Sequence, residues 1–224
     1  MNFLKLSRSV KGKVAIITGA GSGMGEATAK VFAAEGIKVV ATDINFNAVE
    51  RVAGEIESLG GICKPFSLDV TNKKSIEETL KKILTQTNGQ LSALFNNGAY
   101  ALPGALEDVP VESMREIFET NVFGWHHLTR MVIPIMRKQG HGRILQCSSI
   151  LGFITLAYRG PYNSTKWALE ALSDTLRIEL DNTNIYVISI RPGPINTKIK
   201  LNSIPHFEKW INWQNSILYE KYKN

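Results

Sequence analysis

The chain has 224 residues, of which 44% are hydrophobic and 21% charged, an ordinary globular composition with enough length for one sizeable core. Its net charge of +6 lies at the ends, because residues 1–13 carry +4 and residues 198–224 carry +3. Basic ends on a nearly neutral body are typical of solvated termini, so we expect no nucleic-acid partner. No apolar run approaches the roughly 20 residues that cross a bilayer, and no signal-peptide block is present. We therefore expect a cytoplasmic protein without a membrane partner.

The cysteines and histidines do not indicate a metal. Cys63 and Cys147 lie in apolar, strand-like stretches and are interpreted as small core residues in a reducing compartment. No spacing of Cys and His is typical of metal ligands, so no metal site is expected. The histidines are interpreted as surface or packing residues; they are His126, His127, His141 and His206.

Strand-like and helix-like segments alternate along the whole chain. In chain order the pattern predicts strand 14–17, helix 27–35, strand 38–42, helix 46–59, strand 62–68, helix 75–87, strand 91–95, helix 111–137 with Pro134 as a kink, strand 142–147, helix 161–180 and strand 185–190. Strands that alternate with crossover helices predict an α/β fold, a doubly wound parallel sheet of Rossmann type in a single domain. In such a sheet the ligand lies at the carboxyl ends of the strands.

The most informative stretch, residues 18–25, reads Thr-Gly-Ala-Gly-Ser-Gly-Met-Gly. It joins the first strand to the first helix, and a helix start offers free backbone N–H groups and a positive dipole end to a pyrophosphate. Gly19, Gly23 and Gly25 let the backbone turn tightly and approach the phosphates. The pattern predicts a phosphate cradle, although a glycine-rich turn can also simply connect a strand to a helix.

Asp43 ends the second predicted strand, 24 residues after Gly19. An acidic side chain there can accept hydrogen bonds from the free ribose hydroxyls of NAD and would repel the 2′-phosphate of NADP. No arginine lies within residues 42–47 to offset that repulsion. NAD is therefore the preferred cofactor, with NADP as the alternative. The competing interpretation is that Asp43 only caps the next helix.

Tyr162 and Lys166 lie four residues apart on one predicted helix and so share a face. Exchange of hydride between an alcohol and a nicotinamide needs a group that moves the hydroxyl proton, and a nearby ammonium and the positive nicotinamide favour a phenolate. Lys166 can supply that charge and hold the nicotinamide ribose. Ser149, which follows the preceding strand, can hydrogen-bond the substrate oxygen. Ser148 is the rival donor, since only one of two neighbouring strand residues points into the cleft.

These motifs, in this order and spacing, resemble the short-chain dehydrogenase/reductase family over about residues 11–200, nearest to a bacterial branch of uncharacterised members. The family spacing of thirteen residues to the tyrosine selects Ser149 over Ser148. The resemblance implies a catalytic set of Asn121, Ser149, Tyr162 and Lys166, in which Asn121 interrupts the long helix and holds a water that passes protons to the lysine. It implies cofactor contacts from Gly19, Ser22, Gly23, Met24, Gly25, Asp43, Asp69, Val70, Asn97, Ala99, Lys166, Pro192, Gly193, Ile195 and Thr197.

Two of these assignments have alternatives, and a third stretch departs from the family pattern. Asp69 would contact the adenine with Val70, but can also be a cap or turn residue. Residues 96–99 resemble the family's Asn-Asn-Ala-Gly with the last two residues exchanged; Asn96 would be structural and Asn97 would meet the cofactor through its backbone. Asn121, taken alone, would be interpreted as an exposed helical residue.

The resemblance divides the chain into an extension at 1–12, the catalytic domain at 13–197 and a substrate-lid segment at 198–224. Family members usually run further, so we expect a truncated C-terminus, the last strand to be absent and the edge at strand 185–190 to be exposed. Phe207, Trp210, Ile211 and Trp213 are spaced like one face of a helix. The resemblance implies that they lie in the lid over the substrate, and core packing is the alternative.

We therefore expect an NAD(P)-dependent oxidoreductase that interconverts an alcohol and a carbonyl in a small molecule. The alternative is a dinucleotide-binding but catalytically impaired protein or fragment. A homodimer is expected through helices 111–137 and 161–180, which carry apolar residues beyond one inward stripe. These residues are Phe118, Val122, Trp125, Leu128 and Val132 on the first helix, and Trp167, Leu169, Leu172 and Leu176 on the second.

Overall fold

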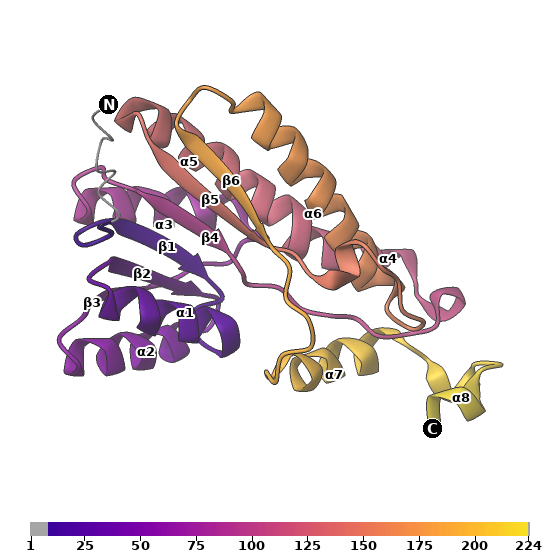
Figure 1. The fold of residues 1–224 in the computed structure, drawn as a ribbon. Coiled ribbons are helices and arrows are strands. Elements are labelled where there is room, and N and C mark those ends of the chain that lie inside the picture. The colour runs from indigo at the N-terminus through magenta and orange to yellow at the C-terminus, as the bar shows by residue number, and fades with distance from the viewer. Residues whose placement is uncertain (1–8, 224) are drawn as a thin grey trace.

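A computed structural model describes residues 9–223, and its centre is one parallel six-stranded sheet (Figure 1). The strands are β1 Val14–Thr18, β2 Lys38–Asp43, β3 Ile62–Ser67, β4 Ala93–Asn96, β5 Gly142–Cys147 and β6 Ile185–Ile190. Their spatial order is β3-β2-β1-β4-β5-β6, so the direction of winding reverses between β1 and β4. This confirms the doubly wound sheet. β6 is an edge strand, and residues 9–223 contain no seventh strand.

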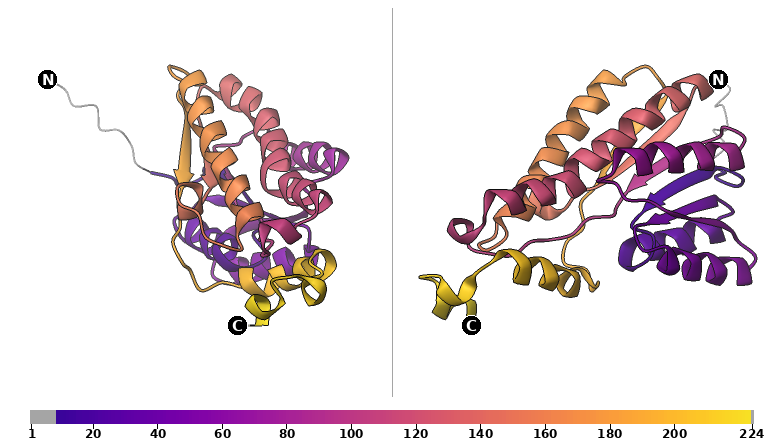
Figure 2. Two further views of the ribbon diagram at one scale, coloured as in Figure 1. Left: turned by 90° about the vertical axis from the view of Figure 1, so that its right-hand side faces the viewer. Right: turned by 180° about the vertical axis from the view of Figure 1, so that it is seen from behind.

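Helices cover both faces of the sheet. They are α1 Gly23–Ala34, α2 Phe46–Ser58, α3 Lys73–Gln86, α4 Val111–Phe118, α5 Trp125–Gln139, α6 Gly160–Glu179, α7 Ile199–Trp210 and α8 Tyr219–Lys223. α1 and α2 cover one face, α3 and α5 cover the other, and α6 runs beside α5 (Figures 1 and 2). Every residue of β1 is buried, as expected for a strand covered on both sides.

The sheet divides the apolar core into two layers because successive strand residues point to opposite faces. Ala15 and Ile17 pack with the α1–α2 layer, whereas Val14 and Ile16 pack with the α3–α5 layer. Both cysteines are free and buried, as predicted, and Cys63 belongs to the first layer.

The predicted helix over residues 111–137 is found in three consecutive parts. A π-helical segment, Glu119–Gly124, separates α4 from α5 and contains Asn121. Gly124 lies against the loop after β3, since a Cβ there would stand 2.3 Å from the carbonyl oxygen of Val70. Pro134 does not end α5, which continues to Gln139.

The C-terminal residues lie along the carboxyl ends of the strands, where α7 and α8 form a layer of their own (Figure 2). The expectation of one continuous helical face is wrong, because α7 ends at Trp210 and Trp213 begins a separate 3-10 turn. The aromatics nevertheless meet in one apolar group, the C-terminal aromatic cluster, around the buried residues Leu102, Ile117 and Ile211. Its half-buried members are Tyr100, Val109, Phe118, Tyr162, Phe207, Trp210, Trp213 and Tyr222.

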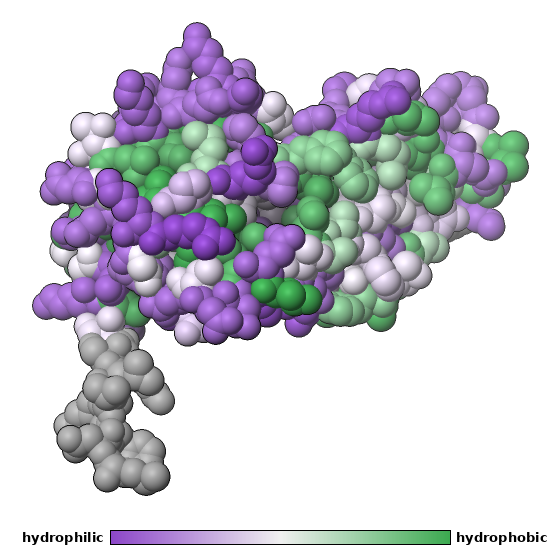
Figure 3. Space-filling model, turned by 90° about the horizontal axis from the view of Figure 1, so that it is seen from above, coloured by the Kyte–Doolittle hydropathy of each residue, from purple (hydrophilic) through white to green (hydrophobic). Residues whose placement is uncertain are grey.

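Most apolar residues assigned to an outward helix face lie in the core instead. Val122, Trp125, Leu128 and Val132 are at most 3% exposed, because this side of α5 faces the sheet. Leu169 of α6 is also buried. Large apolar residues that are exposed along these segments are Val111, Phe123, Trp167, Leu172 and Ile178. Figure 3 shows hydrophobic residues among hydrophilic ones on the side of the molecule that lies uppermost in Figure 1.

Within residues 9–223, no helix combines the length and the apolar character that crossing a membrane requires. Residues 1–8, most of the predicted extension, lie outside the described part of the chain.

Candidate active site

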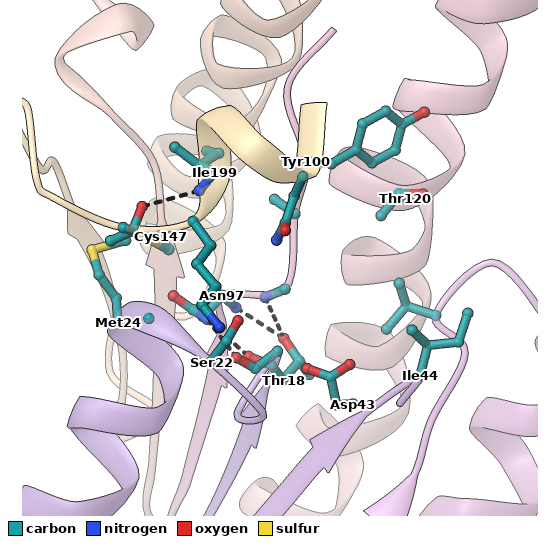
Figure 4. A pocket seen from close by; sticks show the side chains of 18 of the residues that line it. Thr18, Ser22, Met24, Asp43, Ile44, Asn97, Tyr100, Thr120, Cys147 and Ile199 are labelled. Carbon is teal, nitrogen blue, oxygen red and sulfur yellow. Dashed lines mark hydrogen bonds between the residues drawn. The ribbon is translucent and has the colours of Figure 1, made fainter. Parts of the chain in front are cut away.

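A cavity of about 550 Å³ opens at the carboxyl ends of the strands, where the winding reverses, and α7 borders one side (Figure 4). Such a crevice is where doubly wound sheets bind ligands. Twelve of the predicted site residues line it: Gly19, Ser22, Gly23, Met24, Asp43, Asp69, Val70, Asn97, Ala99, Tyr162, Lys166 and Thr197.

The other predicted residues lie behind or beside this wall. Gly25 is buried beneath the glycine turn, and Asn121 and Ser149 lie behind the residues that face the cavity. Pro192, Gly193 and Ile195 belong to the turn after β6 and do not line the cavity, because most of that turn faces solvent. No group of three or more candidate metal ligands occurs in the described residues.

The glycine turn is packed too closely for side chains. A Cβ on Gly25 would stand 2.1 Å from the carbonyl oxygen of Gly19, and one on Gly19 would stand 2.5 Å from Cα of Gly98. Gly23 begins α1 with φ at +56°, in the left-handed region that favours glycine. Ser22 precedes α1 and makes no capping bond with its side chain. The first turn of α1 therefore presents N–H groups toward the cavity, as an anion site requires.

Asp43 is held rigidly at the end of β2. Its carboxylate accepts the backbone N–H of Gly21 at 3.2 Å and that of Asn45 at 3.0 Å. The helix-cap alternative is wrong, because Asn45 caps α2 by accepting the N–H of Ala48. Asp43 is thus a negative charge at the cavity wall beside the glycine turn.

Asp69 follows β3 and is both a cavity residue and a turn residue. Its carboxylate accepts the backbone N–H of Thr71 at 2.9 Å, and the hydroxyl of Thr71 at 2.7 Å. The cap of α3 is Asn72, which accepts the N–H of Ser75. Asp69 is therefore a turn residue, which was one of the alternatives, and it does not cap α3.

The two asparagines after β4 have different surroundings. Asn96 is fully buried and donates to Thr129 at 3.0 Å and to Gln146 at 3.1 Å. Asn97 faces the cavity, and its side chain donates to the carbonyl oxygens of Thr18 at 3.1 Å and Gly19 at 3.3 Å (Figure 4). The side chain of Asn97 thus braces the glycine turn, a contact that sequence reasoning, which assigned it a backbone role, did not anticipate.

Tyr162 and Lys166 lie on α6 and reach the cavity together. The Lys166 side chain is 1% exposed, and its Nζ donates to the carbonyl oxygen of Cys147 at 2.7 Å and lies 5.2 Å from the Tyr162 ring centroid. Burial lowers the pKa of Lys166 to about 8, although Cys147 and Glu170 act in the opposite direction. Lys166 therefore loses its positive charge as the pH rises above about 8.

The residues around Tyr162 do not lower the pKa of its hydroxyl, contrary to the expectation that the nearby ammonium would favour the phenolate. Burial, with a smaller contribution from Cys147, raises the pKa of Tyr162 to about 12, although a hydrogen bond with Ser149 acts in the opposite direction. Burial outweighs the hydrogen bond, so the phenol carries its proton near neutral pH. The serine that interacts with the Tyr162 hydroxyl through a hydrogen bond is Ser149. The hydroxyl of Ser148 is buried without a hydrogen-bond partner.

Asn121 is buried, contrary to the exposed alternative. Its side-chain amide donates to the carbonyl oxygen of Tyr100 at 2.9 Å and to the hydroxyl of Thr165 at 3.3 Å, and its oxygen accepts the N–H of Tyr100 at 3.2 Å. Thr165 precedes Lys166 on α6. Asn121 thus joins the π-helical segment to the loop after β4 and to α6.

Sequence reasoning missed a polar group on the far wall of the cavity. The ring of His206 stacks on that of Tyr100, with centroids 3.7 Å apart, and its Nδ1 lies 3.3 Å from the Glu116 carboxylate. All three residues line the cavity. The interpretation of His206 as a surface or packing residue is therefore incomplete. No local pattern could have found this group, because its members come from three segments up to 106 positions apart.

Comparisons with known proteins agree with this architecture. The family model of the short chain dehydrogenases matches residues 13–206, so the chain belongs to that family. Dehydrogenase/reductase SDR family member 7B of Mus musculus is 36% identical over 201 residues, which are 87% of this chain and 61% of the mouse protein. The uncharacterized oxidoreductase YbbO of Escherichia coli (strain K12) is 35% identical over 199 residues, 88% of this chain and 71% of YbbO.

Among solved structures, the crystal structure of 3-ketoacyl-(acyl-carrier-protein) reductase from Brucella melitensis, complexed with NADH, is similar with a TM-score of 0.81 and 31% identity. The similarity covers 90% of this chain and 83% of that one. The family membership supports an oxidoreductase, and the chain spans less than two thirds of the length of the mouse relative.

Proposed function

We infer that this chain is an oxidoreductase that uses NAD in preference to NADP and interconverts an alcohol and a carbonyl in a small molecule. The observation that carries this inference is the meeting of Tyr162 and Lys166 with the glycine turn in one cavity. The NADH in the similar reductase structure supports the same class of cofactor.

The residues of the cavity fit a dinucleotide. The glycine turn and the start of α1 suit a pyrophosphate, and the Asp43 carboxylate suits a ribose with free hydroxyls. The same carboxylate opposes a 2′-phosphate, and no basic residue follows it within positions 44–47. Asp69 and Val70 would flank the adenine, and Thr197 would close the opposite end. When bound, the cofactor would supply the acceptor or donor of hydride.

Tyr162 would move the proton. Its hydroxyl retains its proton near neutral pH, which suits delivery of that proton to a carbonyl oxygen. Ser149, bonded to Tyr162, would orient the same oxygen, and Lys166 would place a positive charge beside the phenol at pH values below about 8. Asn121, through Thr165 and the loop after β4, would keep α6 in register with the cavity.

The decisive test compares Tyr162→Phe with the unchanged protein and with Tyr186→Phe, a control on the exposed side of β6. Removing only the Tyr162 hydroxyl should lower turnover by at least about 10²-fold in a panel of alcohols and carbonyls while leaving NADH affinity nearly intact. Retained turnover in Tyr162→Phe would refute the assigned role. NADH binding by the unchanged protein without any turnover across the panel would favour the alternative of a catalytically impaired dinucleotide-binding protein.

We also infer a homodimer whose contact includes the exposed face of α6. Trp167 is 49% exposed and Leu172 is 42% exposed, five residues apart on that helix. Large apolar side chains at such exposure are commonly covered by a partner. A groove between α5 and α6, lined by Ile133, Leu172 and Leu176 among others, continues this surface.

A further inference from the structure

The turn after β6 has few contacts of its own. Residues 193–196 are exposed, and the backbone is held near its start by one bond, in which the N–H of Ile150 donates to the carbonyl oxygen of Pro192 at 3.1 Å. This bond joins the turn to the segment that begins with Ser149. Some other contact must set the angle at which residues 192–197 leave the sheet.

That contact is an ion pair at the first residue of the turn. The guanidinium of Arg191 donates to both oxygens of the Glu170 carboxylate, from Nε at 3.1 Å and from Nη2 at 2.8 Å. A two-point bond between planar groups restricts direction as well as distance. The same guanidinium lies over the ring of Phe153, 4.6 Å from its centroid. We call Arg191, Glu170 and Phe153 the Arg191 junction.

Glu170 is a buried charge that the catalytic set does not use. Its side chain is 8% exposed, and it lies on α6 one turn after Lys166 and two turns after Tyr162. Gly152 packs against it so closely that a Cβ there would stand 3.0 Å from Cγ of Glu170. A buried carboxylate without a partner is strongly destabilising, so Arg191 is held firmly at this point.

The junction therefore joins three segments that meet at the cavity. Glu170 belongs to α6 with Tyr162 and Lys166, Phe153 follows Ser149 in the turn after β5, and Arg191 leads into the turn that ends at Thr197. We propose that Glu170 and Arg191 are positioning residues, which hold the turn of residues 192–197 and the Ser149 segment against α6. This proposal rests on the proposed function for its consequence, since the positioned groups are those assigned to the cofactor and substrate.

A supporting effect is electrostatic. The Glu170 carboxylate helps to retain the proton on Lys166, whose pKa burial lowers. Loss of this negative charge should shift the titration of Lys166 to lower pH, whereas loss of Arg191 should not remove that charge. The two partners are therefore distinguishable by the pH dependence of NADH affinity.

The test compares Arg191→Met, Arg191→Lys and Glu170→Gln with Asp174→Asn. The control removes the Asp174 carboxylate, which is exposed one turn further along α6, pairs with Arg177 and acts on Arg191 as a nearby charge without a hydrogen bond to it. Arg191→Met should weaken NADH binding by about tenfold at a temperature where the variant is folded. The NADH affinity of Arg191→Lys should lie between that of Arg191→Met and that of the unchanged protein. The NADH affinity of Asp174→Asn should stay within about twofold of that of the unchanged protein. Glu170→Gln alone should also move the pH profile of binding downward.

A second measurement does not depend on the cofactor. Hydrogen exchange of a peptide covering residues 149–154 should become faster in Arg191→Met, because the Ile150 N–H bond to Pro192 loosens, and should be unchanged in Asp174→Asn. A lower melting temperature with unchanged NADH affinity and unchanged exchange of this peptide would overturn the proposal. Failure of the unchanged protein to bind NADH would instead refute the proposed function, and the exchange measurement would still decide the role of the junction.

Discussion

Replacing Lys166 with methionine should stabilise the folded protein at neutral pH while damaging its site. The Lys166 ammonium is buried, and the pKa of this group falls from 10.5 to about 8. A difference of about 2.5 units at about 1.4 kcal/mol per unit means that holding the charged group in the fold costs about 3–4 kcal/mol. Methionine removes this cost, but leaves the Cys147 carbonyl oxygen without its donor, a loss of about 1–3 kcal/mol. The expected net gain at pH 7 is about 1–2 kcal/mol.

The stabilisation by Lys166→Met should decrease as the pH rises. Below pH 8 the lysine is charged in both the folded and the unfolded chain, so the full cost is present. As the pH rises from 8 to 10.5, the folded protein releases the proton first, and the cost disappears. The advantage of Lys166→Met should therefore be largest at pH 7 and nearly vanish at pH 10.

Urea unfolding at both pH values, followed by circular dichroism, measures this difference. Lys82→Met, on an exposed position of α3, is the matched control and should change stability little at either pH. A Lys166→Met variant that is less stable than the unchanged protein at pH 7, or equally stabilised at both pH values, would show that the charge of Lys166 is not a cost to the fold.

Three further predictions concern the cofactor, the glycine turn and assembly. Asp43→Ala should narrow the preference for NADH over NADPH in fluorescence titrations, and tighter NADPH binding by the unchanged protein would contradict the role of this carboxylate. Gly25→Ala should destabilise the fold by about 1–3 kcal/mol and weaken NADH binding. Gly54→Ala, on α2 with nothing within 4 Å of the new Cβ, should instead stabilise it by about 0.5–1 kcal/mol in thermal unfolding. Light scattering should give a dimer that Trp167→Glu converts to a monomer, and a monomeric unchanged protein would exclude the α6 contact.

Local pattern was sufficient wherever the determining interactions are local. Strands 142–147 and 185–190 were predicted with the bounds that the structure has, because short apolar runs bounded by turn residues are typical of strands in a sheet that helices cover. The glycine turn was also predictable, since its spacing places a strand end, a tight turn and a helix start in succession. Family likeness added the roles of Asp69, Asn121 and Thr197, which composition and periodicity do not carry.

Other properties depend on which segments meet in space, and these only the tertiary structure decided. The apolar residues of α5 point to the sheet, so Trp125 and Leu128 belong to the core and not to an outward face. The His206, Tyr100 and Glu116 group and the Arg191 junction each combine residues from separate segments. The pKa of Tyr162 and that of Lys166 follow from burial, a property of the packed molecule. A sequence lists the charges and apolar groups of a chain, but the cost of each charge is set by what folding places around it.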